Sequence, residues 1–202
     1  MPSRRAWPAL SAKRSCACCA PRSSPHFLFN TLGAVQQLAE EKAPEAAALT
    51  ANLIAFLRAS LDEMRSDTVS LMDDFSLIDA YLRVMHVRLG TRLRFTLTLP
   101  AELAQLHLPS MLLLTLVENA IKHGIEPALR GGEVLVTASA SDGVLRLQVI
   151  DSGIGLVDDP VDGTGLANAR RRLELAHPGA ASLTLVAIED GTMAEITLPV
   201  AA

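Results

Sequence analysis

The sequence is poor in aromatic residues, cysteine, long apolar runs and positive charge. Its 202 residues include one Trp, one Tyr, five Phe and three Cys, and the formal net charge is −4. Without a basic excess, the composition argues against a general nucleic-acid binder, whose affinity rests on neutralising phosphates. The most apolar stretch, Leu108 to Val117, is too short for a membrane span and contains Pro109. We therefore expect a globular, cytoplasmic chain with no membrane span.

The first 24 residues differ from the rest of the chain. They carry five basic residues and no acidic one, so residues 25–202 have a net charge of −9. Cys16, Cys18 and Cys19 all lie in this head, at a spacing that does not match a zinc site. A twin-arginine signal would require an apolar run after Arg4-Arg5, and none follows. An organelle transit peptide would require an amphipathic period, which is also missing. We interpret residues 1–24 as a disordered or aberrant head.

From Pro25 to about residue 90, apolar residues recur at helical spacing. The pattern predicts three helices, over residues 27–38, from Pro44 to Met64, and from Leu71 to about Met85. Each helix carries an apolar stripe that needs a partner. A dimeric helical bundle would supply such partners.

After Gly90 the periodicity changes to alternation, which is typical of strands. Strands are expected over residues 92–99, 133–140, 144–150, 182–188 and 193–198, and Ser141-Asp142-Gly143 has the composition of a hairpin turn. Helices are expected from Pro109 to Lys122, ended by Gly124, and over residues 165–176. Helices packed on one face of a mixed sheet make an α+β fold, with the boundary to the helical region near Gly90.

The segment Pro25-His26-Phe27-Leu28-Phe29-Asn30 places a histidine in the first turn of a helix, with Asn30 on the same face. A neutral imidazole is a good nucleophile, and an amide side chain can fix its tautomer. Taken alone, a histidine at such a position is usually only a surface residue.

A second polar cluster, Glu118-Asn119-Ala120-Ile121-Lys122-His123-Gly124, closes an apolar helix. Asn119, Lys122 and His123 lie at spacings of three and four, so they share one surface. An amide oxygen beside a carboxylate suits magnesium, and the two bases suit phosphate. A solvated helix end has the same composition, because Lys and His also complement the helix dipole.

Two glycine motifs follow. Asp151-Ser152-Gly153-Ile154-Gly155 directly follows an expected strand, where the aspartate can accept a hydrogen bond from an exocyclic amine and the glycines admit a ligand. An ordinary surface turn also favours these residues. Gly163-Thr164-Gly165-Leu166-Ala167-Asn168 opens a helix, whose N–H groups can hold phosphate oxygens. Because no Walker-type string occurs, a nucleotide site here is not a P-loop.

Together these motifs resemble, in order and type, the LytS-type sensor histidine kinases. Pro25–Asn30 corresponds to their phosphoacceptor motif, and the later motifs correspond to the N box and two glycine boxes of the Bergerat-type ATPase domain shared with gyrase, Hsp90 and MutL. The resemblance covers about residues 25–200. It implies a helical dimerisation and histidine phosphotransfer region over 25–90 and an ATP-binding α/β sandwich over 91–202.

The resemblance implies ATP-dependent autophosphorylation of His26 in a homodimer, followed by phosphoryl transfer to an aspartate of a response regulator. Glu118 would polarise the nucleophile, and Asn119 would ligate Mg²⁺ between the ATP phosphates. Asp151 would bind adenine. The remaining implied nucleotide-site residues are Lys122 and His123 near phosphate, and Gly153, Gly155, Gly163 and Gly165 around the pocket.

The chain departs from the family in three ways. Arg22-Ser23-Ser24 stands where a Gln-containing helix normally leads into the histidine motif, and Met85 stands where Glu or Gln is usual. The sensor and membrane segments typical of the family are absent, so we interpret the head as a frameshifted or truncated replacement for them. Two alternatives stay open: a Bergerat-fold serine kinase, which lacks the histidine motif, and a non-catalytic ATP-binding dimerisation module.

Overall fold

The computed structural model describes residues 31, 32, 34, 35, 39, 43–63, 66–156 and 164–200. The predicted head, the predicted acceptor His26 and the predicted pocket residue Gly163 therefore lie outside the described residues. Residues 31, 32, 34, 35 and 39 are helical, in agreement with the helix expected over 27–38 where that segment is described.

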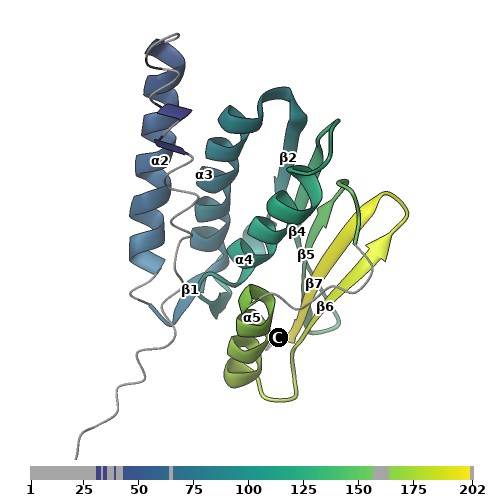
Figure 1. Ribbon diagram of the computed structural model, residues 1–202. Helices are drawn as coiled ribbons and strands as arrows, with labels where there is room; N and C mark the ends of the chain where they lie inside the picture. Colours follow the sequence, from purple (N-terminus) through teal and green to yellow (C-terminus); the bar gives the residue numbers. More distant parts are fainter. Residues whose placement is uncertain are drawn as a thin grey trace, which may run out of the picture.

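Two helices, α2 (Ala43–Glu63) and α3 (Leu71–Leu89), run side by side (Figure 1). Helix α2 accepts Pro44 because a proline in the first turn loses no helical hydrogen bond. Helix α3 begins after Ser70, whose hydroxyl accepts a hydrogen bond from the Asp73 N–H at 3.1 Å. The helices share one core, and two of the predicted helices are confirmed.

A five-stranded sheet follows, in the order β2 (Leu93–Thr98), β4 (Gly132–Ser141), β5 (Val144–Asp151), β7 (Gly191–Pro199) and β6 (Ser182–Ile188). Strands β2 and β4 are parallel and the other pairs antiparallel, so the predicted mixed sheet is confirmed. Asp142 and Gly143 form the tight β4–β5 turn with φ values of 53° and 74°.

One face of the sheet is covered by α4 (Leu112–Asn119), its continuation η3 (Ala120–Ile125) and α5 (Thr164–Ala176) (Figure 1). The strands alternate buried and accessible residues, as expected of a sheet with one covered face. The core between the layers includes, from the sheet, Val134, Val136, Leu147, Val149 and Ile196 and, from the helices, Leu113, Leu116, Val117, Leu166 and Leu173.

The predicted helix from Pro109 to Lys122 is wrong at both ends. Pro109 ends a short strand, β3 (His107–Pro109), which pairs with β1 (Thr68–Ser70), and the helix begins only at Leu112. Gly124 does not terminate the helix, which continues to Ile125 as a wide π-turn. Strands of three residues are too short to show a period. The short turns η1 (Gly90–Arg92) and η2 (Ala101–Leu103) were not predicted either.

Asp74 of α3 is completely buried, and this predicts an unusual dependence of stability on pH. Burial, and then the charge of Glu63, raise its pKa well above the usual 3.8, and the Leu113 N–H and then Arg172 oppose this rise. Because the folded protein then binds a proton that the unfolded chain releases, the free energy of unfolding falls as pH rises above the ordinary aspartate pKa.

We expect Asp74→Asn to flatten this fall, because asparagine carries no charge at any pH. Its unfolding free energy should exceed that of the wild type by on the order of 1 kcal/mol at pH 8, with a smaller difference at pH 5. Urea unfolding across this range measures both slopes. Parallel slopes for the two proteins would show that Asp74 does not change its protonation on folding.

Candidate functional site

The end of β5 meets the end of the α4–η3 helix at Asp151 and Gly124. A Cβ atom added to Gly124 would lie 2.2 Å from Oδ1 of Asp151, and one added to Gly153 would lie 2.2 Å from the Gly124 carbonyl oxygen. Real Cβ atoms essentially never come so close, so a side chain at Gly124 would displace the Asp151 carboxylate and one at Gly153 would displace the Gly124 backbone. The structure therefore brings the Glu118–Gly124 motif into direct contact with the first glycine motif.

Asp151 is held in a fixed orientation beneath the first glycine motif. It is 4% exposed, and its Oδ1 accepts a hydrogen bond from the Gly153 N–H at 3.0 Å. Burial raises the pKa of this carboxyl group, and the Gly153 bond partly opposes the rise. Among the described residues Oδ2 has no hydrogen-bond donor, which leaves it as an acceptor for a donor group of a ligand.

Backbone hydrogen bonds fasten the same loop to its neighbours. The Ile154 N–H donates to the Gly124 carbonyl at 3.1 Å, and the Ser152 N–H donates to the Glu133 carbonyl at 3.0 Å. The Ser152 hydroxyl in turn accepts from the Glu133 N–H at 2.8 Å. Gly155 has a φ of 78°, in the region that favours glycine. The loop is thus shaped by the protein itself.

The polar side chains of the α4–η3 helix differ in their surroundings. Glu118 and Asn119 are half-buried, and Nδ2 of Asn119 is a buried donor without an acceptor among the described residues. Lys122 and His123 are exposed. Burial raises the pKa of Glu118, against the nearby Lys122 charge, whereas burial and then Lys122 lower the pKa of His123. The lowered pKa favours the neutral form of His123.

Glu118 influences a side chain of the helical region. Burial, and then the Glu118 charge, raise the pKa of Tyr81 on α3, so the two side chains lie near each other. Tyr81 is itself buried against Phe56 of α2, with ring centroids 5.7 Å apart. Glu118 therefore lies where the helices that cover the sheet meet α3.

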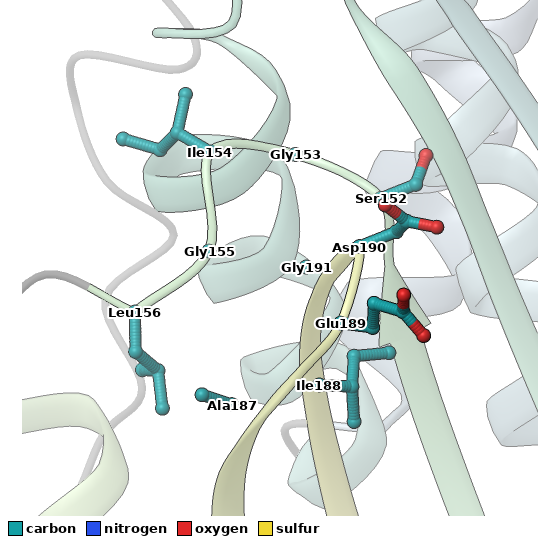
Figure 2. Close-up of a pocket in the computed structure, with 10 residues that line it drawn as sticks. All are labelled: Ser152, Gly153, Ile154, Gly155, Leu156, Ala187, Ile188, Glu189, Asp190 and Gly191. Carbon is teal, nitrogen blue, oxygen red and sulfur yellow. The ribbon is translucent and has the colours of Figure 1, made fainter.

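A pocket of about 370 Å³ lies beside the Asp151–Gly124 contact, between the first glycine motif and the β6–β7 hairpin. Figure 2 shows its lining, Ser152 to Leu156 on one side and Ala187 to Gly191 on the other. Gly153 and Gly155 line it, but Asp151 and Asn119 do not. The pocket thus adjoins the predicted nucleotide residues without containing them all.

The second glycine motif also lies near α4. Gly165 is in the first turn of α5, where a Cβ atom would lie 3.5 Å from Cγ2 of Thr115 on α4. The N-terminus of α5 is therefore beside the helix that carries Asn119. The other predicted glycine of this motif, Gly163, is outside the described residues.

Thr192 is a candidate site residue that the sequence analysis missed. It lies directly opposite Asp151 in the β5–β7 pairing, and its side chain is buried. Paired residues of antiparallel strands project on the same side of the sheet. The only sign of Thr192 in the sequence is that it follows the turn residues Asp190-Gly191. The strand expected there begins one residue later, at residue 193.

This fold and site define an ATPase domain of the histidine kinase, DNA gyrase B and HSP90 type, preceded by kinase helices. Residues 105–202 match the model of the histidine kinase-, DNA gyrase B- and HSP90-like ATPases, and residues 20–93 match that of the histidine kinases. The chain belongs to the histidine kinases and has the features of a LytS-type catalytic core.

Curated relatives agree with this assignment. The chain is 34% identical to the sensor histidine kinase BtsS of Escherichia coli over 71% of this chain and 25% of the relative. It is 29% identical to the sensor histidine kinase YesM of Bacillus subtilis and 27% identical to the sensor protein LytS of Staphylococcus saprophyticus, in each case over 87% of this chain and 32% of the relative. The chain thus spans about a quarter to a third of these proteins.

Solved structures confirm the fold. The histidine kinase domain of the Erythrobacter litoralis blue-light activated histidine kinase aligns with a TM-score of 0.53 at 18% identity, over 84% of this chain and 96% of that one. The Acinetobacter baumannii histidine kinase AdeS aligns with a TM-score of 0.51 at 15% identity, over 87% and 95%. No helix in the described part of our chain combines the length and apolarity needed to cross a bilayer.

Proposed function

We propose that this chain is the catalytic core of a two-component sensor histidine kinase. It transfers the γ-phosphoryl group of ATP to His26, and a response regulator aspartate then receives that group. The observation that carries the proposal is the contact of Asp151 with Gly124, because it joins a buried carboxylate acceptor to the helix that carries Asn119 and Lys122. Residues 25–90 form the phosphotransfer region and residues 91–202 the ATP-binding domain.

The nucleotide is held by groups of complementary chemistry. Oδ2 of Asp151 accepts a hydrogen bond from the adenine amine, since Oδ1 is already bonded to Gly153. Gly153 and Gly155 shape the adenine side of the pocket. Lys122 supplies positive charge to the phosphates, with His123 as a neutral neighbour, while Gly163 and Gly165 contribute backbone at the start of α5.

Asn119 fits a role as magnesium ligand. Its side chain is half-buried with an unpartnered Nδ2, and its Oδ1 is the type of oxygen that Mg²⁺ prefers. Within the described residues no three His, Cys, Asp or Glu side chains gather as a metal site. This agrees with Mg²⁺, which is usually held by one or two protein ligands and the substrate phosphates. When bound, Mg²⁺ neutralises phosphate charge.

Phosphoryl transfer then depends mainly on position. An imidazole nitrogen of His26 forms a bond to the γ-phosphorus as the bond to the bridging oxygen breaks, and ADP leaves. Glu118, near α3, accepts a hydrogen bond from the other imidazole nitrogen and stabilises the positive charge that develops there. Holding the groups in line supplies most of the rate enhancement in such reactions.

The exposed apolar side chains of α2 support a homodimer. Ile54 and Leu61 are 45% and 54% exposed and lie seven residues apart, which places them on one helix face. A second copy of the helical region would cover them. The dimer and the response regulator are therefore part of the proposal.

We expect Asn119→Ala to lower the initial rate of phosphoryl incorporation by at least about 100-fold, because the alanine cannot hold Mg²⁺ on the phosphates. Labelled ATP with and without Mg²⁺ measures this rate. Asn52→Ala removes the same amide group from α2 and should retain the wild-type rate. A rate unaffected by Asn119→Ala would contradict the proposed ligand.

The proposed activity itself is tested by incubating the wild-type chain with labelled ATP and Mg²⁺. Phosphohistidine is labile in acid and stable in alkali, unlike phosphoserine, so the incorporated label should show that behaviour. Acid-stable label would favour a serine kinase. ATP binding without incorporation would favour a non-catalytic ATP-binding module.

A further inference from the structure

Two buried carboxylic acids lie at the start of α4, at the opposite end of that helix from Asn119. Glu63 is the last residue of α2 and is 4% exposed, and Asp74 of α3 is 0% exposed. Three of their four carboxylate oxygens have no hydrogen bond of normal geometry among the described residues. Buried acids without partners are costly, so this pair calls for a functional explanation.

The fourth carboxylate oxygen ties α2 to α4. Oε2 of Glu63 accepts a hydrogen bond from the Met111 N–H at 3.0 Å. Met111 is the residue before α4 and has a φ of 61°, a left-handed conformation that costs free energy in a non-glycine residue. Such a conformation persists only where the surroundings hold it. The Glu63 bond is one contact that does so.

Asp74 and Arg172 bring two further helices to the same place. Burial and then the nearby Glu63 raise the pKa of Asp74, whereas the Leu113 N–H in the first turn of α4 and then Arg172 lower it, so these groups lie around Asp74. Arg172 of α5 donates from Nη2 to the Ser110 hydroxyl at 3.0 Å. Residues from α2, α3, the start of α4 and α5 therefore share one buried site.

The chemistry of this site suits the start of a helix. The first backbone N–H groups of α4 lack helical acceptors and carry partial positive charge, so carboxylates are favourable there. The other end of the helix is held by cations. Arg88 of α3 pairs with Glu126, and Arg92 donates to the carbonyl oxygens of Glu126 and Ala128 at 3.0 and 2.7 Å. The helix is thus held at its start by α2, and at its end by α3 and the turn that follows α3.

We propose that Glu63 is a positioning residue for phosphoryl transfer. Its bond to the Met111 N–H holds the start of α4 against α2, which fixes Glu118 and Asn119 relative to the helical region. This inference rests on the proposed function. A displacement of α2 relative to α4 must break the Glu63–Met111 bond, so the position of α2 controls how the ATP-binding helix is presented to the phosphoacceptor.

The test compares Glu63→Ala with Glu63→Gln, whose amide oxygen can still accept the Met111 N–H. In Glu63→Ala, exchange of the Met111 backbone amide should rise about tenfold. Its autophosphorylation rate should fall about tenfold, while its affinity for ATP stays within about threefold of the wild type, since Glu63 contacts the α4–η3 helix at Met111 and Asp151 contacts it at Gly124, near its other end. Glu63→Gln should restore both exchange and rate.

Asp79→Ala is the matched control, because Asp79 is a partly exposed acid of α3 whose only partner among the described residues is Arg83. It should leave exchange and rate unchanged. Unchanged Met111 exchange in Glu63→Ala would overturn the inference, and so would a rate loss matched by an equal loss of ATP affinity. Absence of labelling in the wild type would refute the proposed function instead, while the exchange comparison would still decide whether Glu63 holds α4.

Discussion

Replacement of His26 by glutamine is expected to reduce phosphoryl incorporation from ATP to below about 1% of the wild-type level, because an amide nitrogen is not a nucleophile. Glutamine has a similar size and polarity, so nucleotide binding should persist. Incorporation is measured with labelled ATP and Mg²⁺, and binding by calorimetry on the same preparation.

A matched histidine variant makes this result specific. His177 follows the last residue of α5 and has no proposed role in the nucleotide site, so His177→Gln should incorporate label at the wild-type level. Persistent labelling of His26→Gln would exclude His26 as the acceptor. Loss of labelling together with loss of ATP binding would show that glutamine disturbs the site instead.

Asp151→Asn is expected to weaken ATP binding by at least about 100-fold. Asparagine has one acceptor oxygen, so it either presents its amide donor to the adenine amine or leaves the Gly153 N–H without an acceptor. The side chain keeps its shape. Because burial raises the pKa of Asp151, replacing its charge with a neutral amide should cost little or no stability. Calorimetric titration with ATP, alongside thermal unfolding of both proteins, separates the two effects.

The control for this substitution lies at the other end of the same strand. Asp142 is exposed in the β4–β5 turn with a φ of 53°, a conformation that asparagine also accepts, so Asp142→Asn should bind ATP normally. Retained affinity in Asp151→Asn would contradict the assignment of Asp151 to adenine. A lowered unfolding temperature in that variant alone would attribute the loss to folding.

The sequence predicts best where one face of an element is buried. Alternation over residues 133–140 and 144–150 predicted strands β4 and β5, because their side chains alternate between the core and the accessible face. The glycine-rich composition after Asp151 indicated a close approach. The composition could not show that Gly124 is the residue these glycines contact, because Gly124 and Gly153 lie far apart in the chain.

Features that depend on register or on burial of charge were not predictable in this way. Thr192 meets Asp151 only through the β5–β7 register, which a single sequence does not specify. Glu63 and Asp74 have the composition of solvated helix residues, yet both are buried. Their burial results from the packing of α2, α3 and α4 on one another, which periodicity within a single helix does not show.

The position of the phosphoryl group tests the central claim most directly. After incubation of the wild-type chain with ATP and Mg²⁺, the protein is digested at alkaline pH and the phosphorylated peptide is sequenced by mass spectrometry. The account predicts the phosphoryl group on His26. A phosphoryl group on a serine, a threonine or another histidine would contradict it.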